Sequence, residues 1–148
     1  MERNVSKLST FKLQPEILVG ENEHRKLLVL ALSGVGHTAD AADDLLYELE
    51  RARIRPDHAL PPDTVRMGST VRYRTEAGET RQVRLVYPGA ADISQGAVSV
   101  LTPVGTALIG LRTGQSITWT TRDGRRSVLT ILEVTDPSEP DPEFPSAA

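Results

Sequence analysis

The stretch Val98–Gly110, with the sequence VSVLTPVGTALIG, decides which fold this chain is expected to adopt. Val98 and Val100 flank a serine, and this alternation of apolar and polar residues predicts a buried strand. Thr102 is suited to cap a helix that follows, because its hydroxyl can accept a hydrogen bond from an N–H group of the first turn. Pro103 then occupies the first helical position, where its missing N–H costs nothing. The stretch therefore predicts a strand that runs directly into a helix.

The predicted helix is only about two turns long. Ala107, Leu108 and Ile109 give it an apolar face, and Gly110 can end it in the left-handed conformation. Because so short a helix is not stable alone, it has to be held by a sheet.

The sequence on both sides of this stretch alternates with a period of two, which is typical of strands. The other expected strands are residues 71–74, 83–87, 117–120 and 126–134. Glu76–Glu79 predicts one hairpin turn, and Asp123-Gly124 predicts a second turn of type I′. Residues 65–135 are therefore expected to form an α+β domain with about four or five antiparallel strands and one short helix. The expected core comprises the strand valines with Leu85, Leu101, Leu108, Ile109, Ile117, Trp119 and Ile131.

Residues 21–55 are expected to form a helical hairpin that resembles a short coiled coil. Glu21–Leu32 and Thr38–Arg53 are the two predicted helices, with Asn22 as a candidate N-cap of the first and Thr38 of the second. Their apolar positions are Leu27, Leu28, Ala31 and Leu32 in the first helix and Ala42, Leu45, Leu49 and Ala52 in the second. The glycine-containing loop between them makes the helices antiparallel, and the second is expected to be about 24 Å long.

Three further segments complete the expected organisation. Residues 1–20 are predicted to be a flexible N-terminus in which Pro15–Val19 forms a short strand-like segment. Residues 56–64 contain Pro56, Pro61 and Pro62, so they predict a stiff linker and a domain boundary. Residues 136–148 are rich in proline and acidic residues, which predicts a disordered tail.

Composition excludes several classes of protein. The chain has 148 residues and a net charge of −3, so it is not expected to coat nucleic acid by neutralising its phosphates. It has no cysteine, so disulfides and thiolate chemistry are not expected. Aromatic residues make up only 4%, which argues against a base-stacking platform. The N-terminus lacks the apolar core of a secretory signal, and the apolar run Leu27–Leu32 is too short to span a bilayer. We expect a cytoplasmic protein without a cofactor, a membrane partner or direct sequence-specific binding to nucleic acid.

No known catalytic constellation stands out, but the tip of the helical hairpin carries candidate residues. They are Gly36, His37, Asp40, Asp43 and Asp44. His37 can be a ligand or a pH-sensitive contact, or it can be a solvated loop residue. The aspartates can hold Mg²⁺ through oxygen ligands, or they can complement the dipole of the second helix. No metal site is expected, because the three histidines lack the spacing of metal ligands.

Arginines in the predicted strands offer a second kind of surface. Arg72, Arg74, Arg81 and Arg84 are expected to lie across one hairpin. This pattern predicts a basic surface that steers the chain onto a charged partner, or a plain solvated sheet face.

Three short sequence motifs, called words below, resemble those of a known family. Leu101–Gly105 reads LTPVG, Ala107–Gly110 reads ALIG and Gly114–Ile117 reads GQSI. In this order the words resemble the C-terminal domain of the Gre transcript-cleavage factors. Within that superfamily, Glu48–Ala52 (ELERA) and Leu85–Pro88 (LVYP) resemble the Rnk family, whose members are named regulators of nucleoside diphosphate kinase.

The resemblance implies an FKBP-like α+β domain that binds bacterial RNA polymerase near the rim of its secondary channel. It implies that Leu101, Thr102, Pro103 and Val104 contact this partner, although Thr102 and Pro103 are also explained as a helix cap and a first helical residue. Gre factors have a longer hairpin with an acidic tip that holds catalytic Mg²⁺ in the polymerase, whereas this hairpin is short and its tip reads GVGH.

We therefore expect a non-enzymatic regulator that occupies the Gre site without stimulating transcript cleavage. Two alternatives remain, of which only the first is suggested by the family name. One is a regulator that binds nucleoside diphosphate kinase directly or affects its level through transcription, and the other is a weak peptidyl-prolyl isomerase.

Overall fold

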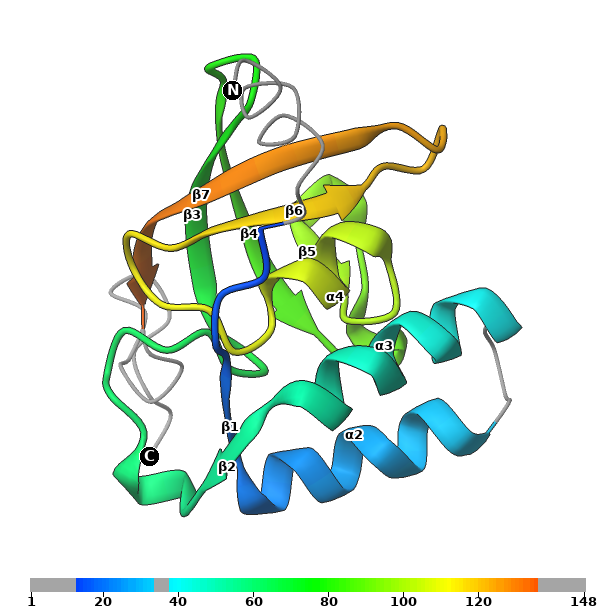
Figure 1. Ribbon diagram of the computed structural model, residues 1–148. Helices are drawn as coiled ribbons and strands as arrows, with labels where there is room; N and C mark the ends of the chain where they lie inside the picture. Colours follow the sequence, from blue (N-terminus) through cyan, green and yellow to red (C-terminus); the bar gives the residue numbers. More distant parts are fainter. Residues whose placement is uncertain (1–12, 34–37, 136–148) are drawn as a thin grey trace, which may run out of the picture.

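The computed structural model describes residues 13–33 and 38–135, which form a helical hairpin packed beside a β-sheet (Figure 1). The helices of the hairpin are α2 (Glu21–Ser33) and α3 (Ala39–Arg51). The sheet consists of β3 (Thr70–Thr75), β4 (Thr80–Val86), β5 (Ala97–Ser99), β6 (Ser116–Thr120) and β7 (Arg126–Thr135). The short helix α4 (Pro103–Leu108) contacts α3 as well as β5 and β6, so it joins the two parts. The architecture is α+β, as the sequence predicts.

The five-stranded sheet has the order β5-β4-β3-β7-β6 and is mostly antiparallel. The pairing of β5 with β4 is parallel, with Leu85 opposite Val98, so this one pair departs from the antiparallel sheet that the sequence predicts. The connection between these strands carries the chain back to Arg84, in the second half of β4, through two 3₁₀ segments, η2 (Pro88–Ala90) and η3 (Ile93–Gln95). A parallel pair requires such a crossover, and alternation of residues does not reveal it.

Both hairpin turns of the sheet have a three-residue loop. The Thr75 N–H donates to the Glu79 carbonyl at 2.7 Å, and the Thr121 N–H donates to the Arg125 carbonyl at 2.8 Å. Gly124 has a φ of +85°, but no non-glycine residue in the described chain has a positive φ. A type I′ turn needs a positive φ at both central residues, so the prediction for Asp123-Gly124 was wrong. The loop instead consists of a type I turn followed by Gly124 in the left-handed conformation.

The helical hairpin has one of its two predicted caps, and its second helix ends earlier than predicted. Thr38 caps α3, since its hydroxyl accepts the Ala41 N–H at 3.1 Å. However, α3 ends at Arg51, because the next residues form β2 (Arg53–Arg55), which pairs in parallel with β1 (Leu18–Gly20). The prediction that this helix continues to Arg53 was wrong because strand pairing with a distant segment replaces the last helical turn.

Asn22 is not the N-cap of α2, because the helix already begins at Glu21. The N–H of Asn22 instead donates to Asp57 Oδ1 at 2.9 Å. Asp57 belongs to the 3₁₀ segment η1 (Asp57–Ala59), within the stretch expected to be a linker. This stretch therefore contacts the start of α2.

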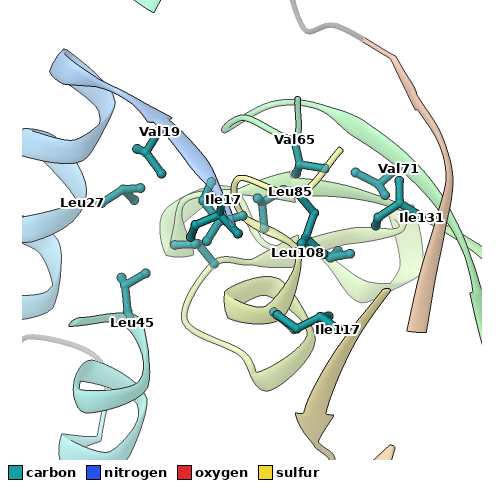
Figure 2. Packing of buried hydrophobic residues seen from close by; sticks show 14 of the residues in the cluster. Ile17, Val19, Leu27, Leu45, Val65, Val71, Leu85, Leu108, Ile117 and Ile131 are labelled. Carbon is teal, nitrogen blue, oxygen red and sulfur yellow. The ribbon is translucent and has the colours of Figure 1, made fainter. Parts of the chain in front are cut away.

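One hydrophobic core connects the hairpin, α4 and the sheet (Figure 2). Leu27 of α2 and Leu45 of α3 are fully buried in the same cluster as Leu85 and Leu108 of the domain. Ile17, just before β1, is also fully buried and belongs to this cluster. Burying each such side chain contributes roughly 1.5–3 kcal/mol, so the core fixes the hairpin against the domain.

Most of the predicted core is confirmed. Leu101 and Trp119 are only partly buried at its edge, and Leu32 of the predicted apolar stripe is 70% exposed. Over residues 13–33 and 38–135, none of the helices has the length and apolar character needed to cross a membrane.

Candidate docking cleft

The β5–α4 junction, defined as Leu101–Val104, is held in one shape by its own side chains. The Thr102 hydroxyl accepts the Gly105 N–H at 3.1 Å, as expected for a helix cap, and donates to the Ser99 carbonyl at 2.7 Å. The Ser99 hydroxyl accepts the Leu101 N–H at 3.0 Å. The bond from the Gly105 N–H satisfies one of the donors that a short helix leaves unpaired at its start.

The helix that follows, α4, is held to the segment before it by a buried side chain. The Thr106 hydroxyl donates to the Val100 carbonyl at 2.6 Å inside the protein. A Cβ atom at Gly105 would overlap the carbonyl oxygen of Ser99, so only glycine allows this close approach. Gly110 has a φ of +81° and ends α4 in the left-handed conformation, which confirms the prediction.

The junction is half-exposed although the helix behind it is buried. Leu101, Thr102, Pro103 and Val104 all keep part of their surface in solvent, whereas Gly105–Leu108 is buried. A rigid, partly apolar surface of this kind loses little conformational entropy when a partner covers it. The four residues predicted from the resemblance to contact a partner are therefore partly accessible to solvent.

A cleft of about 660 Å³ opens between this junction, the start of α3 and the β6–β7 turn. We call it the docking cleft. Its described lining is Thr38, Asp40, Ala41, Asp44, Pro88, Ser99, Leu101, Thr102, Pro103, Thr106, Thr120, Thr121, Arg122 and Gly124. The cleft thus unites two groups of predicted site residues, because Asp40 and Asp44 share it with Leu101, Thr102 and Pro103.

The remaining predicted residues are not among the described residues that line the cleft. Val104 and Asp43 are not part of the lining. Gly36 and His37 fall outside the described residues, so their predicted roles at the tip are not addressed by the structure. Sequence reasoning missed Arg122 and Pro88, which line the cleft because the β6–β7 turn and the loop after β4 border it together with the β5–α4 junction.

A smaller cavity of about 100 Å³ adjoins the docking cleft and shares Asp44, Pro103, Thr106 and Thr120 with it. Of the described residues that line it, Trp119 alone is aromatic. Glu48 also lines this cavity, and it pairs with Arg51 at 2.8 Å. Arg51 in turn donates to the Pro15 carbonyl at 2.8 Å, which fastens the segment before β1 to α3.

Acidic and histidine side chains in the described chain are dispersed. No group of three or more such side chains within residues 13–33 and 38–135 is arranged to hold a metal ion. His24 lies between the helices with Nε2 at 3.0 Å from the Leu49 carbonyl, while His58 is exposed in η1. The two histidines therefore occupy separate structural positions.

Glu23 is the acidic residue whose environment is most unusual. Burial raises its pKa above 4.5, against the opposing effects of the nearby Arg66 guanidinium and a hydrogen bond from the Met67 N–H at 3.2 Å. It lies where α2 meets the loop before β3, away from the docking cleft. Burial likewise raises the pKa of Tyr73 and of Tyr87.

The strand arginines do not share a single face. Arg72, Arg74 and Arg84 occupy exposed positions on one face of the sheet, whereas Arg81 pairs with Tyr73 on the opposite face. Arg72 forms an ion pair with Glu133 at 2.9 Å, and Arg81 forms one with Glu79 at 2.8 Å. The expectation of a four-arginine surface across one hairpin was therefore wrong, because the strand alternation separates its members.

Comparison with known proteins places this fold in a family. Residues 60–136 match the family model described as transcription elongation factor GreA/GreB, C-terminal. The Escherichia coli (strain K12) protein named regulator of nucleoside diphosphate kinase is 35% identical over 122 residues, which cover 82% of this chain and 90% of that protein. GreA from Syntrophobacter fumaroxidans is 44% identical over 68 residues, which cover 45% of this chain and 43% of that factor.

A solved structure has the same fold. The transcription elongation factor GreA/GreB from Nitrosomonas europaea superposes with a TM-score of 0.64 at 36% identity, and the match covers 82% of this chain and 99% of that one. These relatives are named as a regulator or as elongation factors. The family model and the similarity over most of the chain show that this protein belongs to the GreA/GreB family and, within it, to the Rnk family.

Proposed function

We propose that this protein is a regulator of transcription that binds bacterial RNA polymerase at the rim of the secondary channel and does not stimulate transcript cleavage. The β5–α4 junction is the docking element. It is the half-exposed, internally hydrogen-bonded part of the domain that belongs to the GreA/GreB family.

The hydrogen-bonded conformation of the junction is the observation that carries this function. Thr102 and Ser99 hold the backbone that presents Leu101 and Pro103, so these two apolar side chains are already in position before a partner arrives. Because these side chains are ordered in advance, little conformational entropy is lost when a partner covers them.

The absence of cleavage activity is supported by the helical hairpin. Each of its helices has 13 residues and is therefore about 20 Å long. The resemblance to Gre factors implies that their cleavage activity depends on a longer hairpin with an acidic tip. Asp40 and Asp44 of α3 instead line the docking cleft beside the junction.

Binding to RNA polymerase core enzyme tests the docking function. We expect the wild-type protein to bind at micromolar or lower concentration and to be displaced by excess GreA. Pro103→Ala should raise the dissociation constant at least about fivefold, which corresponds to about 1 kcal/mol at an important interface residue. Pro62→Ala changes an exposed proline outside the docking cleft and should bind like the wild type.

A cleavage assay on backtracked elongation complexes tests the second half of the proposal. We expect no increase in the cleavage rate when saturating protein is added, whereas GreA as a positive control accelerates it. Gre-like acceleration by this protein would contradict the proposal.

Direct binding of nucleoside diphosphate kinase is a second candidate, favoured by the name of the Escherichia coli relative. A stable complex with the purified kinase, together with no binding to polymerase, would favour it over the first. Turnover of a proline-containing peptide that is lost in Trp119→Ala would instead identify an isomerase.

A further inference from the structure

Three arginines of the β3–β4 hairpin lie on the face of the sheet that is turned away from the core. Val71 and Leu85 of the same two strands are buried in the hydrophobic core. Side chains alternate between the two faces of a strand, so Arg72, Arg74 and Arg84 project from the opposite face. All three are exposed, and we call them the arginine face.

Two members of the arginine face lack a partner of opposite charge. Arg72 pairs with Glu133 on the neighbouring strand β7 at 2.9 Å. Over residues 13–33 and 38–135, neither Arg74 nor Arg84 forms an ion pair. The guanidinium groups of Arg74 and Arg84 are therefore available to an anionic partner.

The acidic residues at the borders of the arginine face have partners of their own. Asp92, on the β5 side of the sheet, accepts the Ser94 N–H at 3.1 Å and the Ser94 hydroxyl at 2.7 Å. In the turn between β3 and β4, Glu79 pairs with Arg81 at 2.8 Å, and Glu76 accepts a backbone N–H of β7 at 3.0 Å. These three carboxylates are therefore engaged with other groups of the described chain.

The chain leaves the sheet beside the arginine face. The strands β7, β3 and β4 are neighbours in this order (Figure 1). Thr135, at the end of β7, lies opposite Thr70 of β3, and Thr70 lies opposite Arg84 of β4. Neighbouring strands are about 4.8 Å apart, so the backbone of residue 135 is about 10 Å from that of residue 84. The residues that follow Thr135 therefore start next to this face.

The sequence after Thr135 is complementary in charge to the arginine face. Residues 136–148 lie outside the described residues, and we call them the acidic segment. The acidic segment contains no lysine or arginine, and its charged side chains are Asp136, Glu139, Asp141 and Glu143.

We infer that the acidic segment binds the arginine face of the same chain, with its carboxylates on Arg74 and Arg84. This contact goes beyond the proposed function, because no residue of the arginine face lines the docking cleft. It is a reversible electrostatic contact within one molecule. The acidic segment thereby competes with other anions for the same two guanidinium groups.

The acidic segment is long enough to reach both arginines. An extended chain spans at most about 3.4 Å per residue, so the stretch from Thr135 to Glu139 covers up to about 14 Å. This exceeds the distance of about 10 Å to Arg84. Arg74 is about 15 Å from residue 135, and the stretch to Asp141 covers up to about 20 Å. Because the segment is covalently attached, its local concentration is roughly millimolar, which compensates for the weakness of exposed ion pairs.

A nitroxide label tests the contact in the full-length protein. The chain has no cysteine, so Ser146→Cys provides a single labelling site beyond the last acidic residue. At about 0.01 M salt, where the Debye length is about 30 Å, the label should broaden the amide NMR signals of residues 72–74 and 82–84. At about 1 M salt, where the Debye length is about 3 Å, this broadening should be lost.

Substitutions in the labelled protein identify the charges that carry the contact. The double variant Arg74→Gln, Arg84→Gln should lose the broadening at low salt. Arg81→Gln is the matched control, because it removes the same charge from the opposite face of β4 and should keep the broadening. The amide signals of the rest of the molecule show whether each variant remains folded.

The acidic segment can be neutralised in the same way, by Glu139→Gln, Asp141→Asn and Glu143→Gln together. The broadening should again be lost, because the segment then has too little charge to hold it on the arginine face. A short fluorescent DNA duplex serves as a competing anion. It should bind this neutralised variant more tightly than the wild type at low salt, because the arginine face is then open.

Other results would overturn the inference. Broadening that is absent at low salt, or that persists at high salt or in the double arginine variant, would show that the arginine face does not hold the segment. Broadening confined to other residues would assign the segment to another surface. If the duplex binds the wild type and the neutralised variant equally and loses affinity in the double arginine variant, the occupant of this face is nucleic acid. The proposed function is tested separately, by binding of the docking cleft to polymerase.

Discussion

Gly105 is the residue that allows the docking junction to form. The backbone of Ser99 and Val100 lies so close to its Cα that no side chain fits, although the φ angle of Gly105 is not in the left-handed region. The need for glycine at this position comes from close approach of two backbone segments. Thr102 can then cap α4 while it donates back to the Ser99 carbonyl.

Gly105→Ala should therefore destabilise the protein by about 1–3 kcal/mol, the range for overpacking in a well-packed core. The free energy of unfolding in urea measures this loss. Gly89→Ala is a matched control, because a Cβ atom there meets no atom within 4 Å and its φ is not positive. Equal stability of the two variants would show that the backbone around Ser99 can move aside at little cost.

At the scale of elements, the helical hairpin is attached to the domain by contacts that cross long stretches of sequence. Asp57 of η1 accepts the Asn22 N–H at the start of α2 and lies 4.0 Å from Arg66. Gly20 leaves room for this carboxylate, because a Cβ atom at that position would overlap it. The segment that the sequence predicts to be a linker thus supplies the cap of a helix that begins far earlier in the chain.

Replacement of Asp57 by alanine should cost about 1 kcal/mol of stability, the typical loss when a helix cap is removed. Amide hydrogen exchange in the first turn of α2 should also become faster, because the Asn22 N–H loses its acceptor. Asp63→Ala, in the same segment, should leave both quantities unchanged. Unaltered exchange at the start of α2 in Asp57→Ala would mean that water replaces the carboxylate without loss.

At the scale of the whole molecule, Glu23 makes stability depend on pH. It lies between α2 and the loop before β3, where burial raises its pKa and Asp57 adds to the effect, while Arg66 and Lys26 oppose it. Because its pKa in the folded protein exceeds 4.5, the folded state holds the Glu23 proton to a higher pH than the unfolded state does. The stability that comes from the protonated carboxyl is complete below pH 4.5 and is lost as the pH rises through the folded pKa.

Glu23→Gln removes this titration and keeps an oxygen that can accept the Met67 N–H. The free energy of unfolding of the wild type should therefore fall relative to that of Glu23→Gln as the pH rises from below 4.5 to neutrality. Urea unfolding of both proteins across this range provides the measurement. Parallel pH profiles would show that Glu23 has the same proton affinity in the folded and unfolded states.

Local sequence determined the elements from which this protein is built. Thr102, Pro103 and Gly110 define the start and end of α4 through interactions within a few residues, so they can be identified from the chain alone. The hairpin helices and most strands follow from apolar periodicity for the same reason. The words LTPVG, ALIG and GQSI were sufficient to indicate the family.

Only the tertiary structure decided how these elements meet. Parallel pairing joins β1 to β2 and β4 to β5, which are separated in sequence. Asp57 likewise caps α2 from a distant segment. Glycine is required at position 105 because a turn brings the backbone of Ser99 and Val100 close to it. The docking cleft is of this kind, since Asp44 and Pro103 share it although 59 positions separate them. Periodicity and capping report interactions along one segment, whereas a cleft depends on how several segments pack around a common core.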